Sequence, residues 1–250
     1  MNDETTWVGA PSVLVLPDDE IHVWRASLDQ EPAVAADLKD TLSEDEKARA
    51  TRFHFERDQC RFIVARGLLR RMLADYLRQE PNALRFCYGP KGKPSLRVSN
   101  TWLPEISFNL AHTNGQAVYA FALSRCLGID IEMIRDDFPA IEIAKRFFSL
   151  KEIDQLLDLS RDERHEAFFL GWTRKEAYIK ALGEGLHIEL DSFSVTLLPG
   201  REACFLHGVD SDWHLVSFSS NGVPGALVHD GPKCSIRYLN ISVPGLQGAK

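Results

Sequence analysis

Two short segments of this 250-residue chain carry side chains that could bind a metal ion beside a phosphate. In the first, Asp130 and Glu132 alternate with apolar residues, and a strand with this period of two puts both carboxylates on one face. In the second, Glu176 and Lys180 stand four residues apart in a stretch without helix breakers, so they share one helix face. Carboxylate oxygens beside a cation are how proteins hold Mg²⁺ against a phosphate. If this strand packs on this helix, the sequence predicts a single reaction centre.

Both segments also have an ordinary structural interpretation. A strand with two acidic residues on one face commonly turns that face to water. Glu176 and Lys180 can form a salt bridge across one helical turn, which is compatible with a role at a metal site. Because both segments occur in one chain, we favour the reaction centre.

The hydrophobic pattern predicts blocks of strands and helices along the chain. Each half contains a capping box, at 43–46 and at 149–152, and the similar order of elements is a weak indication of an internal repeat. We expect the strand at 129–133 to pair beside the strand at 116–123. The predicted elements, in chain order, are a strand at 21–26, helices at 32–40 and 58–78, strands at 86–88, 107–110, 116–123 and 129–133, helices at 141–146 and 161–182, and strands at 193–198, 213–219, 226–228 and 235–239.

Composition and charge restrict the class of protein. The net charge of −7 does not favour a polyanion such as nucleic acid, although eight Lys and Arg residues lie between Lys47 and Arg71. The N-terminus lacks the basic and apolar regions of a signal peptide, and no apolar run reaches membrane-spanning length. Five widely spaced cysteines without a C-x-x-C motif indicate reduced thiols and a cytoplasmic protein.

The two segments, written as G-x-D-x-E and W-x-x-K-E-A-x-x-K, resemble the signature of the Sfp-type 4′-phosphopantetheinyl transferases. Two further segments, at 89–94 and 108–112, fit the same family in the same order, and the chain length suits its broad-specificity branch. The resemblance covers about residues 52–194. The matching residues of the first two segments are Gly128, Asp130, Glu132, Trp172, Lys175, Glu176, Ala177 and Lys180.

This resemblance implies an α+β fold made of two similar α+β halves related by a pseudo-twofold axis, with the active site at their interface. The boundary would fall near Arg125. Residues 1–125 would then form the half that contacts coenzyme A, and residues 126–250 the half that carries the metal-binding carboxylates. We expect such a pseudo-dimeric chain to be a monomer.

The resemblance also implies the reaction. A holo-[acyl-carrier-protein] synthase of this type transfers 4′-phosphopantetheine from coenzyme A to a serine of an apo acyl or peptidyl carrier protein, with Mg²⁺, and releases adenosine 3′,5′-bisphosphate. Asp130, Glu132 and Glu176 would be the Mg²⁺ ligands, and Lys180 would contact a phosphate. Glu152 has two interpretations of equal weight, the glutamate of a capping box and the general base for the serine.

The contacts with coenzyme A follow from the same resemblance. The segment at 91–94 reads first as a plain turn, and a histidine after a strand is usually structural. By resemblance, however, this turn would lie against the adenine end and the histidine would contact a phosphate. The family often has a serine before that histidine, and the alanine here leaves only a backbone amide. Arginines at the start of the basic helix would reach the 3′-phosphate. The residues in these roles are Lys91, Lys93, Pro94, Ala111, His112, Arg57 and Arg61, with Arg66 as the alternative arginine one turn later.

Two other functions remain open. A Mg²⁺-dependent hydrolase of nucleotide pyrophosphates would use water in place of the serine and would turn over without a carrier protein. A non-catalytic module could bind coenzyme A or carrier proteins. The presence of all three carboxylates and of Lys180 argues against the module.

Overall fold

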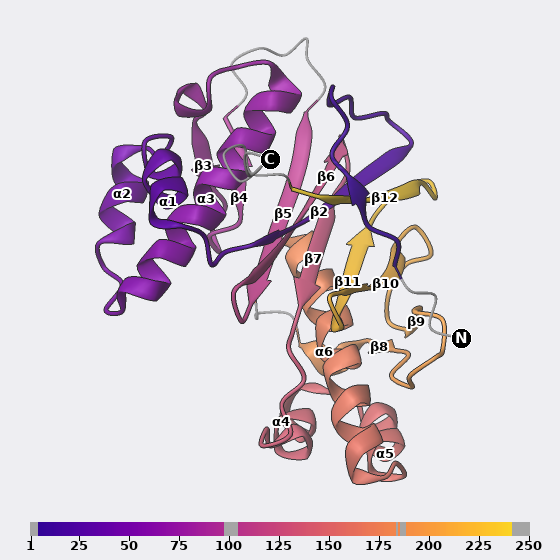
Figure 1. Cartoon of the computed structure of the whole chain (residues 1–250). Helices are drawn as coiled ribbons and strands as arrows, with labels where there is room; N and C mark the ends of the chain where they lie inside the picture. Colours follow the sequence, from indigo (N-terminus) through magenta and orange to yellow (C-terminus); the bar gives the residue numbers. More distant parts are fainter. Residues whose placement is uncertain (1–4, 98–104, 184, 186–188, 242–250) are drawn as a thin grey trace.

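The computed structural model describes residues 5–97, 105–183, 185 and 189–241. It is a mixed α+β fold (Figure 1), in which three helices gather beside the largest sheet, two short helices lie at the far end of the molecule, and one long helix runs from that end along the smaller sheet. The helices are α1 (Pro32–Lys39), α2 (Glu44–Ala50), α3 (Glu56–Leu77), α4 (Ala140–Phe147), α5 (Leu150–Leu157) and α6 (Arg161–Leu182), with 3-10 turns at Pro81–Ala83 and Leu190–Ser192.

The strands form two main sheets and two short hairpins. The larger sheet has the order β1-β12-β2-β6-β5, the smaller has the order β10-β11-β7, and β3 pairs with β4 and β8 with β9. The strands are β1 (Val8–Gly9), β2 (Glu20–Ser27), β3 (Phe86–Tyr88), β4 (Pro94–Leu96), β5 (Ile106–Thr113), β6 (Gln116–Leu123), β7 (Leu127–Ile131), β8 (Ser194–Val195), β9 (Phe205–His207), β10 (His214–Ser220), β11 (Val223–His229) and β12 (Ser235–Asn240).

The two halves of the chain use the same order of strands. In the first half β2, β6 and β5 are consecutive antiparallel neighbours, and in the second half β7, β11 and β10 have the corresponding order. In each half a helix of 22 residues, α3 or α6, precedes the hairpin. This repeated topology supports the predicted relation between the halves, whereas the twofold axis itself stays a prediction.

Two strand pairings differ from the sequence prediction. We expected β7 beside β6, but β7 pairs with β11, with Asp130 opposite Ala226. In addition, β12 from the end of the chain returns to the first half and pairs in parallel with β2. Both pairings join segments far apart in sequence, and no local pattern specifies such partners.

The core consists of apolar layers on the faces of these sheets. One layer packs α3 with β2 and β6, and Leu69 and Leu73 of α3 are fully buried in it. A second layer lies between the two sheets and includes Ile129 of β7. A third surrounds α6, where Trp172 stacks on the ring of Phe168. The sheets are also joined by a side chain, because the amide oxygen of buried Asn109 accepts a hydrogen bond from the backbone of Ile129 at 2.9 Å. Among the described residues, no helix is long and apolar enough to cross a membrane.

Candidate active site

The backbone of β7 lies directly against the backbone of α6 at Gly128. A methyl group at this position would collide with the carbonyl oxygen of Ala177 and the amide nitrogen of Ala181. No side chain therefore separates the strand from the helix. This close approach brings Asp130, two residues further along β7, beside Lys180. The predicted packing of the strand that carries Asp130 on the helix that carries Lys180 is confirmed.

We expect Gly128→Ala to lower the free energy of unfolding by about 1–3 kcal/mol, because the methyl group must push α6 away from β7. Urea denaturation measures this change, and Gly9→Ala is the matched control, because nothing lies within 4 Å of the added methyl group. Transfer activity should fall with stability, since α6 carries Glu176 and Lys180. Equal unfolding free energies for the two variants would show that β7 and α6 are not packed in this way.

Asp130 is a buried carboxylate with only one of its oxygens satisfied. Its Oδ1 accepts a hydrogen bond from Lys180 Nζ at 2.6 Å. Its Oδ2 is buried and has no hydrogen-bond partner within the part of the chain that the structure describes. Burial raises the pKa of Asp130, and the ammonium of Lys180 opposes that shift. A buried charged oxygen without a partner is costly, and a bound cation would relieve that cost.

The side chains of Glu132 and Glu176 lie near Asp130 and Lys180. Burial is the main cause that raises the pKa of each, and the charge of Asp130 raises both further, whereas Lys180 lowers them. Glu132 also accepts a hydrogen bond from Thr113 Oγ1 at 3.4 Å. When ionised, the three carboxylates and one ammonium leave two negative charges uncompensated. The donor set therefore fits a divalent cation with hard oxygen ligands.

The side chains are not already arranged around such an ion. Among the described residues, no group of three or more His, Cys, Asp or Glu side chains stands ready to hold a metal. Instead, the ammonium of Lys180 forms an ion pair with Oδ1 of Asp130.

A cavity of about 280 Å³ opens beside this cluster. Its walls come from the loop before β4, from β5 and from the end of α6, and the lining residues are Lys91, Gly92, Lys93, Asn109, Leu110, Glu176, Ile179, Lys180, Gly183 and Gly185. The ammonium of Lys93 is already engaged, because it donates to the carbonyl oxygens of Leu127 at 3.0 Å and Ala181 at 2.9 Å. Lys93 thus ties the first half to the end of α6, which leaves its methylene groups and backbone for the predicted contact with coenzyme A.

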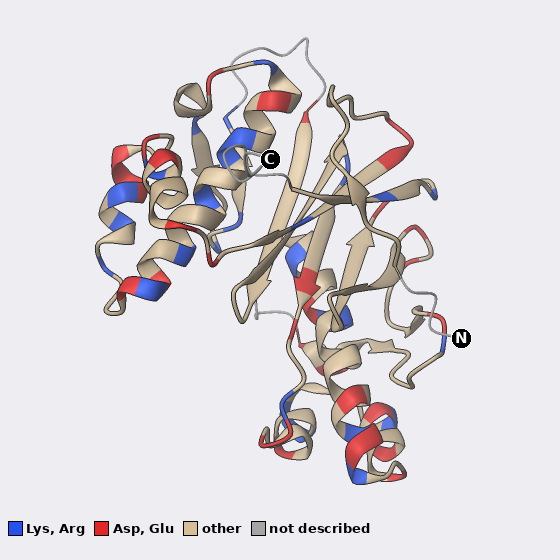
Figure 2. Ribbon diagram, viewed as in Figure 1, with Lys and Arg blue, Asp and Glu red and all other residues tan. Residues whose placement is uncertain are grey.

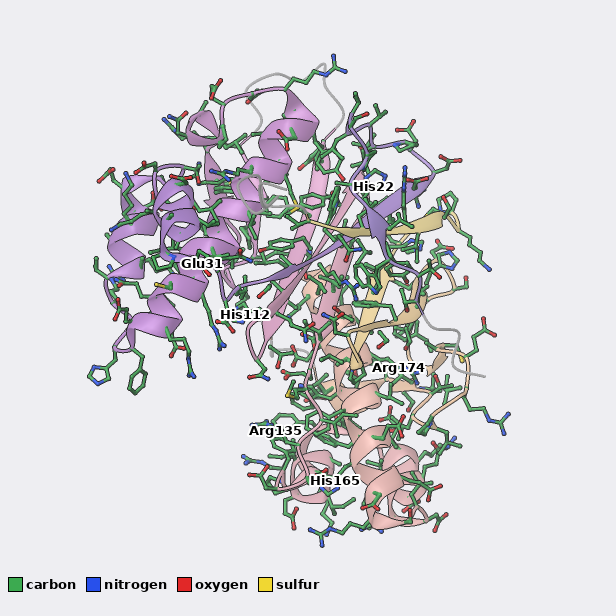
Figure 3. All side chains as sticks on the ribbon, viewed as in Figure 1. His22, Glu31, His112, Arg135, His165 and Arg174 are labelled. Carbon is green, nitrogen blue, oxygen red and sulfur yellow. The ribbon has the colours of Figure 1, made fainter. Side chains whose placement is uncertain are left out.

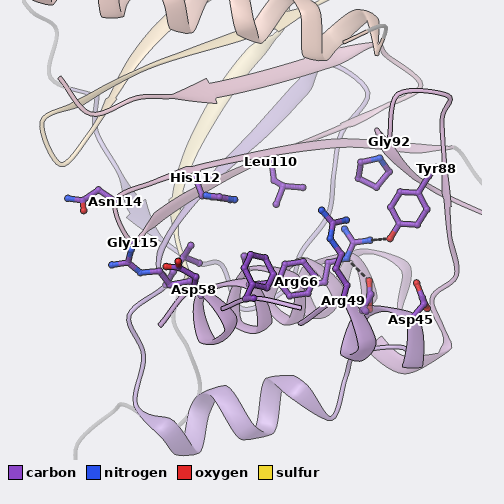
Figure 4. Close-up of a pocket in the computed structure, with 17 residues that line it drawn as sticks. Asp45, Arg49, Asp58, Arg66, Tyr88, Gly92, Leu110, His112, Asn114 and Gly115 are labelled. Atoms are coloured by element: carbon purple, nitrogen blue, oxygen red, sulfur yellow. Dashed lines mark hydrogen bonds and ion pairs between the residues drawn. The ribbon is translucent and has the colours of Figure 1, made fainter. Parts of the chain in front are cut away.

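A larger cavity of about 420 Å³ adjoins the first, and the two share Gly92 and Leu110 as walls. Figure 4 shows Arg49, Arg66 and Tyr88 towards one end, Asn114 and Gly115 at the other, and His112 along one wall. The full lining is Leu28, Asp45, Glu46, Arg49, Phe53, Asp58, Arg61, Phe62, Ala65, Arg66, Tyr88, Gly92, Pro94, Leu110, His112, Asn114 and Gly115.

The arginines expected to reach a phosphate have different surroundings. Arg61 lines the larger cavity, whereas Arg57 is outside its lining, 70% exposed, and paired with Asp58. Arg66 also lines the cavity, but its guanidinium is held by buried Glu46 and by the hydroxyl of Tyr88. Acidic and basic residues alternate over these helices (Figure 2), so the predicted basic face is largely neutralised by pairing.

Arg49 is a candidate that the sequence prediction did not single out. It lines the larger cavity, and its guanidinium lies 5.4 Å from the ring centre of Phe62. The available signal was its position three residues after Glu46 on α2, which places both side chains on one helix face.

His112 lines the larger cavity. Alternation along β5 turns His112 and Leu110 towards the cavities, and turns Ala111 into the core between the sheets. Burial, followed by the nearby charges of Lys180 and Arg61, lowers the pKa of His112. In Figure 3 this histidine faces the N-terminal helices, far from buried Arg174 in the second half. Positive groups therefore extend from Arg61 past His112 to Lys180.

Glu152 has a different environment from the other carboxylates. The capping box is confirmed, because Oε2 accepts from the backbone of Ser149 at 2.8 Å and from its hydroxyl at 2.9 Å. Oε1 accepts from the backbone of Val195 at 2.9 Å, and Lys175 Nζ lies 2.9 Å from Oε2. With 1% exposure and both oxygens engaged, Glu152 has no free lone pair directed to solvent. This geometry favours the structural role, and the role of Glu152 as the general base stays a prediction.

Lys175, which matches the family pattern, is turned away from Lys180 into the core. Its ammonium donates to the carbonyl oxygens of Leu190 at 2.8 Å and Phe193 at 2.6 Å, in addition to its contact with Glu152. Burial lowers the pKa of Lys175, and the charge of Glu152 opposes this shift. The buried pair fixes α6 against α5 and the segment before β8.

Comparisons with known proteins match both halves. The model of the 4′-phosphopantetheinyl transferase superfamily matches residues 126–230, and the model of the N-terminal part of 4′-phosphopantetheinyl transferases matches residues 23–124. The 4′-phosphopantetheinyl transferase HetI of Nostoc sp. is 40% identical over 200 residues, which cover 79% of this chain and 83% of HetI. Sfp of Bacillus subtilis is 35% identical over 62% of this chain and 66% of its own.

A human protein is also similar. The L-aminoadipate-semialdehyde dehydrogenase-phosphopantetheinyl transferase of Homo sapiens is 32% identical over 64% of this chain and 54% of its own length. The matches include the carboxylate cluster on β7 and α6 and the cavities beside it. The chain therefore belongs to the 4′-phosphopantetheinyl transferase family.

Proposed function

We propose that this protein transfers 4′-phosphopantetheine from coenzyme A to a serine hydroxyl of an apo acyl or peptidyl carrier protein, with Mg²⁺, and releases adenosine 3′,5′-bisphosphate. The observation that carries the proposal is the cluster of Asp130, Glu132, Glu176 and Lys180 beside two adjoining cavities lined by basic side chains. Family membership supports coenzyme A and carrier proteins as the two substrates.

In this proposal the nucleotide end of coenzyme A occupies the larger cavity. Arg61 and Arg49 would bind its 3′-phosphate, and the loop with Lys91, Lys93 and Pro94 would cover the adenine. The pyrophosphate would extend past His112 towards Lys180. His112 can be protonated and Lys180 is positively charged, so both side chains suit a phosphate. The reacting phosphorus would then lie beside the carboxylate cluster.

Asp130, Glu132 and Glu176 would hold the Mg²⁺ ion, whose chemistry here is to neutralise charge on the pyrophosphate. The chain's own groups do the rest by position and charge. The serine oxygen bonds to the β-phosphorus, and the bond from that phosphorus to the bridging oxygen of the nucleotide breaks. Lys180 would stabilise the charge on the phosphate oxygens.

The serine proton needs an acceptor within hydrogen-bond reach. We propose a carboxylate of the cluster, with Glu176 as the first candidate, because it lines the smaller cavity. Glu152 is enclosed by its own partners and is the weaker candidate.

We further propose that the protein acts as a cytoplasmic monomer without nucleic-acid or membrane partners. Both sides of the site come from one chain, so a second copy is not needed to complete it. All five cysteines are free, as expected in a reducing compartment.

Release of adenosine 3′,5′-bisphosphate, followed by liquid chromatography, tests the proposed reaction. The product should form only when an apo carrier protein is present together with coenzyme A and Mg²⁺. A carrier in which the acceptor serine is replaced by alanine is the control. Equal release with and without a carrier would identify a hydrolase instead.

Arg61→Ala should raise the KM for coenzyme A about ten- to a hundredfold, because a hydrogen bond between charged groups contributes about 1.5–3 kcal/mol. The KM for 3′-dephospho-coenzyme A, which lacks that phosphate, should hardly change. Arg57→Ala is the matched comparison and should have a smaller effect, since Arg57 is outside the cavity lining. Equal increases of both KM values in Arg61→Ala would contradict the contact.

A further inference from the structure

Asp29 forms a two-point contact with Arg61 at one end of the larger cavity. Arg61 Nε donates to Asp29 Oδ1 at 2.7 Å, and Arg61 Nη2 donates to Oδ2 at 2.8 Å. The side chain of Asp29 is 57% exposed and that of Arg61 is 21% exposed. Ion pairs this accessible to water add little to folding stability. A contribution to folding stability therefore does not explain this contact.

The backbone around the pair is closely fitted. Asp29 follows the end of β2, and the preceding residue, Leu28, is fixed because its N–H donates to the carbonyl of Gly115 at 2.7 Å. Gly115 forms the β5–β6 turn with Asn114, and both residues have positive φ. A methyl group on Gly115 would lie 2.5 Å from Asp29 Oδ2 and 2.8 Å from Arg61 Nη2. The β5–β6 turn therefore packs directly against the carboxylate of Asp29 and the guanidinium of Arg61.

Within the described part of the chain, the contact with Asp29 leaves one edge of the Arg61 guanidinium without a hydrogen-bond partner. A guanidinium has five N–H donors in a rigid planar fork. Asp29 takes the edge formed by Nε and Nη2, so the edge formed by Nη1 and Nη2 remains for a second two-point acceptor. A phosphate monoester is such an acceptor. Because the plane is fixed by the carboxylate, the direction of the free edge is fixed as well.

We propose that Asp29 is a positioning residue that holds the guanidinium of Arg61 with its free edge directed to a phosphate monoester in the larger cavity. This inference rests on the proposed function, in which that phosphate is the 3′-phosphate of coenzyme A. Asp29 itself does not touch the phosphate. Its contribution is to fix the guanidinium plane in advance, so that less side-chain freedom is lost when the phosphate binds.

Charge alone predicts the opposite change in the affinity for coenzyme A when Asp29 is neutralised. A carboxylate next to a phosphate site repels the ligand, so simple electrostatics would make the neutral variant Asp29→Asn bind coenzyme A more tightly. A positioning role makes the same variant bind it more weakly, because asparagine has only one oxygen to accept from the fork. The direction of the change therefore separates the two interpretations.

The experiment measures steady-state kinetics with saturating apo carrier protein and Mg²⁺, with coenzyme A and 3′-dephospho-coenzyme A as alternative donors. Asp29→Asn should raise the KM for coenzyme A three- to tenfold and leave the KM for the dephospho donor within twofold. Asp29→Glu, which retains two acceptor oxygens, should restore most of the affinity. In Arg61→Ala, adding Asp29→Asn should have no further effect. Thermal melting verifies that each variant is folded.

Three results would overturn the proposal. A lower KM for coenzyme A in Asp29→Asn would make Asp29 a competitor of the phosphate. Equal changes with both donors would make the pair a general structural contact. If Arg61→Ala itself affects both donors equally, the phosphate contact of Arg61 fails and this inference fails with it, whereas transfer to the carrier protein would still stand.

Discussion

Asp130→Ala and Glu176→Ala should each reduce Mg²⁺-dependent transfer by on the order of 10²–10³-fold or more, while the protein remains folded. Each change removes an oxygen ligand from a cluster that has two negative charges in excess of Lys180. Folding should survive, because Asp130→Ala removes a buried carboxylate whose Oδ2 has no hydrogen-bond partner among the described residues. Lys180 is 31% exposed, so its ammonium can reach water.

Thermal melting with and without Mg²⁺ separates a metal site from a general loss of structure. An ion at ten times its dissociation constant adds about 1.4 kcal/mol to the free energy of unfolding. The wild-type protein should therefore melt at a higher temperature with Mg²⁺, and the two variants should not. Asp162→Ala, an acidic residue at the exposed start of α6, is the control and should behave as the wild type. Wild-type turnover in either cluster variant would refute the metal assignment.

Lys175→Met should lower the free energy of unfolding by about 3–5 kcal/mol, the usual cost of removing one partner of a buried ion pair. Glu152 would lose its cationic partner in a site with 1% exposure, and the carbonyl groups of Leu190 and Phe193 would lose their donor. Urea denaturation measures the loss. Lys151→Met, at an exposed neighbouring position on α5, should change stability by no more than about 0.5 kcal/mol.

A double variant makes this prediction more specific. In Lys175→Met with Glu152→Gln, the uncompensated charge is gone, and the amide oxygen can still accept from Val195 or from Ser149. Part of the lost stability should return. A loss below about 1 kcal/mol in Lys175→Met alone would mean that the pair is hydrated rather than buried. If folded Glu152→Gln has no transfer activity, Glu152 would again be a candidate for the general base.

The part of the site that follows local periodicity was predictable from the sequence. The helix at 161–182 was predicted with its observed bounds, and the alternation at 129–133 placed Asp130 and Glu132 correctly on one face. Gly128 is the reason that these two elements meet, and its role follows from the helix backbone packed on it. Periods of 2 and 3.6 residues are properties of the local chain, so one sequence is enough to read them.

Features that depend on distant partners were not predictable in the same way. The pairing of β7 with β11 and the return of β12 to β2 join strands that share no local signal. Which arginine faces the cavity depends on helix rotation: Arg49, Arg61 and Arg66 line the larger cavity, whereas Arg57 does not. Likewise, motif matching alone could not reveal that two carbonyl groups engage the ammonium of Lys93.

Intact-mass spectrometry of apo acyl and apo peptidyl carrier proteins, incubated with this protein, coenzyme A and Mg²⁺, tests the proposed transfer itself. The carrier protein should gain about 340 Da, one phosphopantetheine group carried by coenzyme A. The gain should be absent with a serine-to-alanine carrier and with Asp130→Ala. Carriers of unchanged mass in a reaction that still consumes coenzyme A would contradict transfer and identify a hydrolase.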